Sequence, residues 1–402
     1  MRVDELMEKN HTACMGCSAC ANACPAGVNA IKMQEDGEGF RYPSIDEARC
    51  INCGACARAC PVLSTVELPD EADPEAYAYM STDEEVRRHS SSGGCFYGLA
   101  KQVIEDGGVV FGAGFDAGWE VEHQSADNLD SLIRLCTSKY VQSRIGETYR
   151  SVRRELKTGR PVLFVGTPCQ CAGLHNYLHG NPENLLLVDF ICHGVPSPLV
   201  WRKYVTFLSQ KKRKEIRRIS FRNKNLSWER YLLTVDFVNV NKYLGYAQDL
   251  NHDLYLKGFL QNLYLRPSCY ECQFCRRGRV TDVTLADYWG VAEEEPDMYD
   301  GRGTSLVLVH SERGRKVFEK LAGRSKRTDY MRAVKHNPSY IQPAVMNPKR
   351  SAFFQELNDT EDICGLLHRY TKMPLRRRVV RMMKAIIKTI PGAKRLYHHL
   401  KQ

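Results

Sequence analysis

The chain has 402 residues, which is enough for two or three domains with their own cores. Apolar residues make up 43% and charged residues 26%, a mixture that excludes a disordered chain, a collagen and a coiled coil. The net charge of +10 arises at the end of the chain, because residues 1–362 carry 46 Lys and Arg against 47 Asp and Glu. A body without a basic stripe argues against nucleic acid as a partner.

The first ten residues, MRVDELMEKN, lack the apolar stretch of a secretory signal peptide. No run of eighteen apolar residues occurs either, so a spanning helix is not expected. We therefore expect a cytoplasmic protein. In that reducing compartment its 17 cysteines are expected to remain thiols, and the clustered ones are expected to bind metal.

Two copies of the pattern CxxCxxCxxxCP occupy the first sixty residues. This pattern is typical of bacterial ferredoxins, in which each run gives three thiolates to one 4Fe–4S cluster and the fourth to the other. Structural zinc is the alternative, but zinc ribbons use two CxxC pairs rather than a quartet that ends in Cys-Pro. A ferredoxin module over residues 1–62 would carry single electrons. The expected ligands are Cys14, Cys17, Cys20 and Cys60 for one cluster, and Cys50, Cys53, Cys56 and Cys24 for the second.

Residues 63–76 are acidic and interrupted by proline, which is typical of a linker. From residue 77 to residue 345, strand-like apolar runs alternate with amphipathic stretches, and this predicts an α/β body. The predicted strands are 77–80, 108–115, 161–166, 185–191, 232–238, 283–289 and 304–310. The predicted helices are 94–105, 146–157, 170–179, 198–210, 253–264 and 312–323.

Three loops in the body carry residues suited to binding. The Ser-Gly run at 90–94 precedes a predicted helix and offers hydroxyls and backbone N–H groups to a phosphate, although a plain serine cap explains it as well. The loops at 166–170 and 192–193 each follow a predicted strand. Ligands of open α/β sheets gather at the carboxyl ends of strands, so we expect these two loops to face one site.

Cys269, Cys272 and Cys275 repeat the CxxCxxC spacing within the body. Three cysteines need a fourth ligand, and Cys192 and Cys169 are the candidates because both follow predicted strands. We expect a third 4Fe–4S cluster here, with structural zinc as the alternative. Neighbouring arginines within 276–279 would offset the thiolate charge and raise the potential of the cluster. The isolated cysteines are expected to be ordinary buried side chains: Cys95, Cys136, Cys171 and Cys364.

Eight motifs follow one another in the body. They are SSGGCFYGLA, SKYVQS, GTPCQCAGL, DFICHGVPSP, SFRNK, PSCYECQFC, RVTDVTLADYWG and GTSLVLVH. Together they resemble the coenzyme F420 hydrogenase/dehydrogenase beta subunit family, over about residues 75–345, and many members of it carry a fused ferredoxin module. Many members also have two cysteines where this chain has three in 269–275, and would need both Cys169 and Cys192. Here one of the five could be spare.

The resemblance implies a flavoprotein that holds FAD beside a 4Fe–4S cluster and exchanges a hydride with F420 or another two-electron substrate. By motif position, Lys139 would stabilise an anionic reduced flavin and is the expected catalytic residue, with a solvated surface lysine as the alternative. The implied FAD residues are Ser91, Ser92, Gly93 and Gly94 at the phosphates, Ser138, Lys139 and Tyr140 at the flavin, and Thr167 and Gln170 nearby.

The expected fold class is therefore a multi-domain α/β (α+β) protein: a small ferredoxin-like module, a mixed-sheet flavin-binding body and a basic C-terminal helix. Within the body, the resemblance implies an N-terminal-like domain over 77–160 and a C-terminal-like domain over 161–345. The expected activity is that of a ferredoxin- or F420-linked oxidoreductase. One alternative is an electron-transfer subunit of a larger hydrogenase or dehydrogenase complex with no substrate of its own, and a redox or iron sensor is another.

Residues 346–402 form a basic tail without an acidic residue after Asp362. Within 375–390, apolar residues recur at helical spacing and cations fall on the opposite side, which predicts a basic amphipathic helix. Such a helix can lie on an anionic membrane, here the inner face, or dock on the body or on a partner. The apolar positions are Val379, Met382, Met383, Ile386, Ile387 and Ile390.

Overall fold

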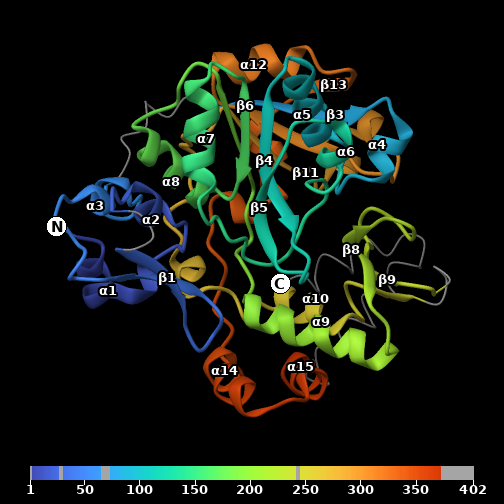
Figure 1. Ribbon diagram of the computed structural model, residues 1–402. Coiled ribbons are helices and arrows are strands. Elements are labelled where there is room, and N and C mark those ends of the chain that lie inside the picture. The colour runs from blue at the N-terminus through green and yellow to red at the C-terminus, as the bar shows by residue number, and fades with distance from the viewer. Residues whose placement is uncertain (1, 27–29, 65–72, 241–244, 373–402) are drawn as a thin grey trace.

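The computed structural model describes residues 2–26, 30–64, 73–240 and 245–372. Within these ranges the protein has a mixed α/β architecture. A small N-terminal module lies beside a large central sheet, and a second, smaller sheet with several helices lies at the lower end of the view (Figure 1).

Two short helices and a hairpin build the N-terminal module. α2 (Ala19–Ala23) follows Ser18 and α3 (Ala55–Ala59) follows Gly54, and both of these preceding residues have left-handed backbone, with φ of 60° and 70°. Five-residue helices are not stable alone, so their packing on each other and on the body supports them. The remaining elements are α1 (Asp4–Asn10), a 3₁₀ helix (His11–Ala13), and the antiparallel strands β1 (Ile31–Glu35) and β2 (Arg41–Ile45).

One eight-stranded mixed sheet organises the body. Its strands are β3 (Glu75–Ser81), β4 (Val109–Phe115), β5 (Val121–Ala126), β6 (Val162–Gly166), β7 (Leu185–Phe190), β11 (Val283–Asp287), β12 (Ser305–Val309) and β13 (Gly323–Thr328). Their order is β13-β3-β12-β11-β7-β6-β4-β5. The four strands β11, β7, β6 and β4 run parallel, and antiparallel strands flank them on both sides.

Helices cover both faces of this sheet. On β6, Val162 and Phe164 pack toward α7 (Thr148–Lys157) and α8 (Pro168–Leu178), while Leu163 packs on the opposite face. That second face is covered by α5 (Cys95–Glu105) and α12 (Glu312–Glu319). Burial on both faces explains why the central strands read as continuous apolar runs.

The second sheet has three antiparallel strands in the order β10-β9-β8, which are β8 (Ile216–Asn223), β9 (Leu232–Phe237) and β10 (Tyr246–Asp249). It shares one hydrophobic core with four helices and with Phe40 and Tyr42 of the module. The module therefore packs on the body in two places: Phe40 and Tyr42 pack in this core, and Ala19 and Ala59 pack against α7 and α8. The helices are α9 (Pro198–Lys212), α10 (Leu254–Leu260), α14 (Arg350–Asp359) and α15 (Ile363–Thr371).

The predicted strands and helices are all present, with shifted ends. The helix expected over 253–264 ends at Leu260, and β3 begins at Glu75, within the segment expected to be a linker. Residues 77–160 and 161–345 contribute strands to the same sheet, so the division between them stays a prediction. The amphipathic helix expected within 375–390, and the roles expected for it, lie outside the described residues.

Several short elements complete the structure. Within the described ranges, no helix combines the length and apolar character needed to cross a membrane. The short helices are α4 (Glu84–Arg88), α6 (Leu129–Leu132), α11 (Val291–Glu294) and α13 (Tyr330–Lys335), with 3₁₀ helices at Pro267–Glu271, Pro296–Met298 and Pro338–Tyr340.

Candidate iron–sulfur and cofactor site

The first cysteine group, Cys14, Cys17, Cys20 and Cys60, lies in the buried half of the module. Each of these side chains is 7–8% exposed. Burial raises the pKa of Cys20 well above its ordinary value, and the charges of the other three thiols add to the effect. The four thiols expected to share one cluster are therefore brought together.

The second cysteine group, Cys24, Cys50, Cys53 and Cys56, lies closer to solvent. Cys53 is exposed, and Cys24 and Cys50 are half-buried. Burial raises the pKa of Cys56, and the charge of Cys24 contributes to that shift. The structure therefore brings Cys24 of the first run to Cys56 of the second, as the exchange of fourth ligands requires.

Local backbone geometry sets the position of these cysteines. The third cysteine of each run lies inside a short helix, Cys20 in α2 and Cys56 in α3. Each helix stops one residue before the fourth cysteine, and Cys24 and Cys60 have extended backbone. All 17 cysteines of the chain are free thiols.

A body cysteine group forms from three distant segments. Cys169 lies in the first turn of α8, Cys192 follows β7, and the others come from the loop that begins with the 3₁₀ helix at Pro267. Burial raises the pKa of Cys192, and the charges of Cys269, Cys169 and Cys272 raise it further. The group consists of Cys169, Cys192, Cys269, Cys272 and Cys275.

Both candidates for the fourth ligand therefore face the loop cysteines. The backbone N–H of Val195 donates to Cys269 Sγ at 3.4 Å, and the Thr167 hydroxyl lies 3.1 Å from Cys169 Sγ. The Cys275 thiol donates a hydrogen bond to Cys272 and lowers the pKa of Cys272. Five thiols surround a site that needs four, so the choice between Cys169 and Cys192 stays open.

The donor chemistry fits iron–sulfur clusters, because the first group brings four thiols together, the body group brings five, and the second run places Cys56 beside Cys24. Across the described ranges, no three His, Cys, Asp or Glu side chains are placed to hold a single metal ion. Of the cysteines expected to be isolated, Cys95 and Cys171 are buried, whereas Cys136 and Cys364 are half-buried.

The first group and the body group meet across α8. A Cβ atom on Gly173 of that helix would lie 3.0 Å from Cys17 Sγ, so the helix backbone is in direct contact with the module. The charge of Cys169, one turn earlier, also raises the pKa of Cys17, after burial and the charge of Cys60. One helix thus links a module cysteine with a body cysteine.

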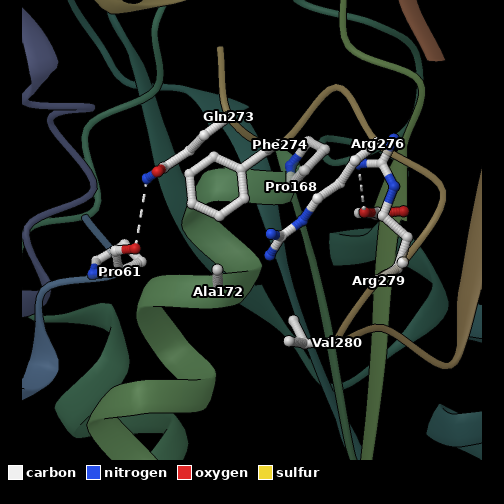
Figure 2. A pocket seen from close by; sticks show the side chains of 10 residues that line it. Pro61, Pro168, Ala172, Gln273, Phe274, Arg276, Arg279 and Val280 are labelled. Carbon is white, nitrogen blue, oxygen red and sulfur yellow. Dashed lines mark hydrogen bonds and ion pairs between the residues drawn. The ribbon is translucent and has the colours of Figure 1, made fainter. Parts of the chain in front are cut away.

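A pocket of about 430 Å³, including its open mouth, lies at this junction (Figure 2). Gln273 reaches the module, where its amide donates to the carbonyl oxygen of Pro61 at 3.4 Å. On the other side of Phe274, Arg279 pairs with the buried Asp189 at 3.3 Å. The pocket therefore adjoins Cys60, Cys169 and the 272–275 loop at once.

The residues expected to hold FAD form a second region. The Ser91 hydroxyl lies 3.0 Å from the Ser138 hydroxyl and accepts the Ser138 N–H at 2.8 Å. The Ser92 hydroxyl donates to a carbonyl of Thr304, and a Cβ on Gly93 would lie 2.2 Å from the Tyr79 carbonyl oxygen. Gly93 is therefore required by the approach of strand β3, whatever the loop binds.

The other expected FAD residues also have local partners. Lys139 Nζ donates to the carbonyl oxygens of Arg134 and Cys136 at 2.9 and 2.8 Å, and burial lowers its pKa to about 8. Tyr140 stacks on Phe259 with ring centroids 4.8 Å apart. The remaining three act at helix starts: Gly94 precedes α5, and Thr167 with Gln170 forms a capping box on α8.

Sequence reasoning missed two cations that lie against the serine loop. Arg222 Nη2 donates to the Ser91 carbonyl oxygen at 3.0 Å, and Lys224 Nζ donates to the Ser92 carbonyl oxygen at 3.0 Å. Arg222 Nε is buried without a hydrogen-bond partner, which fits an anionic ligand such as a cofactor phosphate. In the sequence, these two residues stand out only as the basic residues of the motif SFRNK. The motif does not indicate which loop they contact.

Comparison with known proteins agrees with the motifs. Residues 159–329 match the family described as the C terminus of the coenzyme F420 hydrogenase/dehydrogenase beta subunit, and residues 13–63 match the 4Fe-4S dicluster domain. A chain of the F420-reducing [NiFe] hydrogenase complex from Methanosarcina barkeri aligns over 80% of this chain and 96% of that chain, with 13% identity and a TM-score of 0.43. No curated protein matches. The predicted resemblance is confirmed over these two ranges: residues 13–63 are similar to a 4Fe-4S dicluster domain, and residues 159–329 are similar to the C terminus of the coenzyme F420 hydrogenase/dehydrogenase beta subunit.

Proposed function

We propose that this chain is an iron–sulfur flavoprotein oxidoreductase that passes electrons between its 4Fe–4S clusters and FAD, with hydride exchange to F420 or another two-electron substrate. The matches to the F420 family and to the dicluster domain support an electron-transfer oxidoreductase in general terms. When bound, the clusters would carry single electrons, and FAD would combine two of them into a hydride.

The observation that carries this proposal is the junction at α8. Cys17 of the first group contacts the backbone of α8 at Gly173, and Cys169 of the body group lies in the first turn of the same helix. The second group adjoins the first through Cys56, whose charge raises the pKa of Cys20 after burial and the nearer thiols. The three groups therefore form a series that leads from the exposed Cys53 into the body.

The residues have separate tasks in this proposal. The first and second groups hold the two module clusters, and Cys269, Cys272 and Cys275 hold the third together with either Cys169 or Cys192. The serine-glycine loop at 91–94 binds the cofactor phosphates, supported by Arg222 and Lys224, and Ser138 and Tyr140 line the flavin. Lys139, with a pKa of about 8, is mostly protonated at pH 7 and supplies a positive charge at the flavin.

Iron and flavin content after anaerobic purification tests the proposal. About twelve iron atoms and about one FAD per chain are expected, because three clusters contain four irons each. About eight irons without flavin would leave a ferredoxin module on a body with no redox centre and would contradict it. A matching zinc determination distinguishes a zinc-bound body group from a vacant one.

A second function rests on the description of the matched family as a beta subunit. In that case the chain is an electron-transfer subunit of a larger hydrogenase or dehydrogenase complex and has no substrate of its own. Turnover of reduced F420 by the isolated, cofactor-loaded chain with an artificial electron acceptor would exclude this alternative. No turnover with F420 or with reduced ferredoxin, despite full cofactor loading, would favour it.

A further inference from the structure

Arg266 occupies an unusual position between the module and the body. Its side chain is completely buried, at 0% exposure. Nε donates to the Cys14 carbonyl oxygen at 2.8 Å, Nη1 to Gln142 Oε1 at 3.1 Å, and Nη2 to the Arg41 carbonyl oxygen at 3.0 Å. The guanidinium also lies over the Tyr42 ring, 4.2 Å from its centroid. The side chain therefore crosses from the body into the module.

The charge of Arg266 is not balanced by a carboxylate. All three of its acceptors are neutral oxygens, and among the residues described no ion pair joins it to Asp or Glu. A buried charge without a counter-ion is costly, and proteins retain one where an opposite charge arrives with a ligand or a cofactor. Other buried arginines here have such partners: Arg87 pairs with Asp300, and Arg222 with Asp287.

Two cysteine groups lie on either side of this guanidinium. Toward the module, Nε contacts the carbonyl of Cys14, and a Cβ on Gly16 would lie 2.8 Å from Nη1. Toward the body, the Arg266 carbonyl accepts the backbone N–H of Cys269 at 2.9 Å. The guanidinium charge also acts on Cys169 and Cys269: burial raises the pKa of both thiols, and the positive charge of Arg266 lowers it.

We propose that Arg266 is a positioning residue whose uncompensated buried charge favours the reduced state of the clusters held by the first group and by the body group. This inference rests on the proposed function. A reduced cluster carries one more negative charge than an oxidised one, and a nearby cation in a poorly solvated site stabilises that charge. The second group serves as an internal reference, because none of the hydrogen bonds that Arg266 makes within the described ranges reaches Cys24, Cys50, Cys53 or Cys56.

The test is a redox titration, monitored by electron paramagnetic resonance, of the full-length, cofactor-loaded chain and its Arg266→Gln variant. We expect the variant to shift the reduction equilibrium of the first and body clusters at least tenfold toward the oxidised state, which is about 59 mV for a one-electron couple. The second cluster should not move. Arg266→Lys keeps the charge and should remain close to the wild type.

A second variant covers the case in which Arg266→Gln fails to fold. Gln142→Glu keeps Arg266 in place but sets a carboxylate against Nη1, and should shift the same two clusters in the same direction. Arg150→Gln is the matched control, because Arg150 donates to the Cys24 carbonyl but is already paired with Glu147. Unmoved potentials in a fully loaded Gln142→Glu or Arg266→Gln protein would overturn the inference, as would an Arg266→Lys protein that shifts as far as Arg266→Gln.

The two possible failures remain distinguishable. A wild-type protein with about eight irons contradicts the proposed function, because the body cluster is then missing. A first cluster whose potential does not respond to Arg266 contradicts this inference alone, since that cluster belongs to the dicluster domain and does not depend on FAD.

Discussion

The module and the body hold their cysteines in different ways. In the module, the ligands come from two compact runs, and helices of five residues set their direction. In the body, Cys169, Cys192 and the 269–275 loop come from distant parts of the chain, and the parallel strands β6 and β7 bring the first two together. A local motif fixes one kind of site, whereas the other depends on the completed sheet.

The largest expected effect separates the two kinds of site directly. Cys272→Ser should remove the body cluster, about four of twelve irons, and leave the module clusters in place. Iron analysis and the absorption spectrum measure this loss. Cys136→Ser, at an isolated cysteine of the body, is the control and should keep the full content. Loss of all iron in Cys272→Ser would mean that the module depends on the body site.

The next largest expected effect concerns the contacts that dock the module on the body. Arg150 of α7 donates to the carbonyl oxygens of Ala21, Asn22 and Cys24 at 3.0–3.2 Å. Arg150→Ala should lower the stability by about 1–3 kcal/mol, since buried carbonyls lose a charged donor. Chemical denaturation measures this loss of stability, and limited proteolysis between the module and the body shows whether the module has come away from the body. Arg154→Ala, one turn along the same helix, should change little because Arg154 is exposed and its hydrogen bond to Ser151 lies within the same helix.

The half-buried Lys139 distinguishes the body in its response to pH. Burial lowers the pKa of Lys139 from 10.5 to about 8, so between these values the unfolded chain binds more protons than the folded one. Stability should therefore rise with pH across pH 8–10 by up to about 1.4 kcal/mol per unit from this group. Denaturation of wild type and Lys139→Met at several pH values measures it. Equal slopes for the two proteins would show that Lys139 does not titrate in this range.

The smallest effect concerns the contact at α8. Gly173→Ala places a methyl group 3.0 Å from Cys17 Sγ, whereas Gly98→Ala in α5 meets its nearest atom at an ordinary 3.4 Å. Alanine gains about 1 kcal/mol over glycine in a helix. Gly98→Ala should therefore raise the stability, whereas Gly173→Ala should not. The difference should be clearest in protein whose first cluster is bound, because that cluster holds Cys17 in place. Thermal unfolding of both variants makes the comparison, and an equal gain in both would argue against a tight junction.

Much of this arrangement could be predicted from the sequence. The cysteine runs identify the module, because the ligands of one cluster lie within a few residues. The central strands follow from continuous apolar runs such as 185–191. Strand β13 was missed because GRSKRT is polar and largely exposed, as suits a sheet edge where cations prevent pairing with another chain.

The interactions of the buried arginines could not be predicted in the same way. Arg266 contacts the backbone of Cys14, 252 residues away in the sequence, and Arg222 contacts Ser91, 131 residues away. Both bind carbonyl oxygens, which every residue type offers, so no residue pattern marks the partner. Likewise, the position of Cys169 and Cys192 after predicted strands made both of them candidates for the fourth ligand of the body group, and the fold brings both close to the 269–275 loop.

Because α8 has two roles, binding of the body cluster and docking of the module on the body are thermodynamically linked. The helix that carries Cys169 is the one whose Gly173 backbone receives Cys17. If Cys169 is the fourth ligand, a cluster bound in the body also stabilises the surface on which the module docks, and this stabilisation increases with the affinity of the cluster. Iron starvation would then empty the body site and also weaken the docking of the module on the body. Proteolysis between the module and the body would become faster as a result.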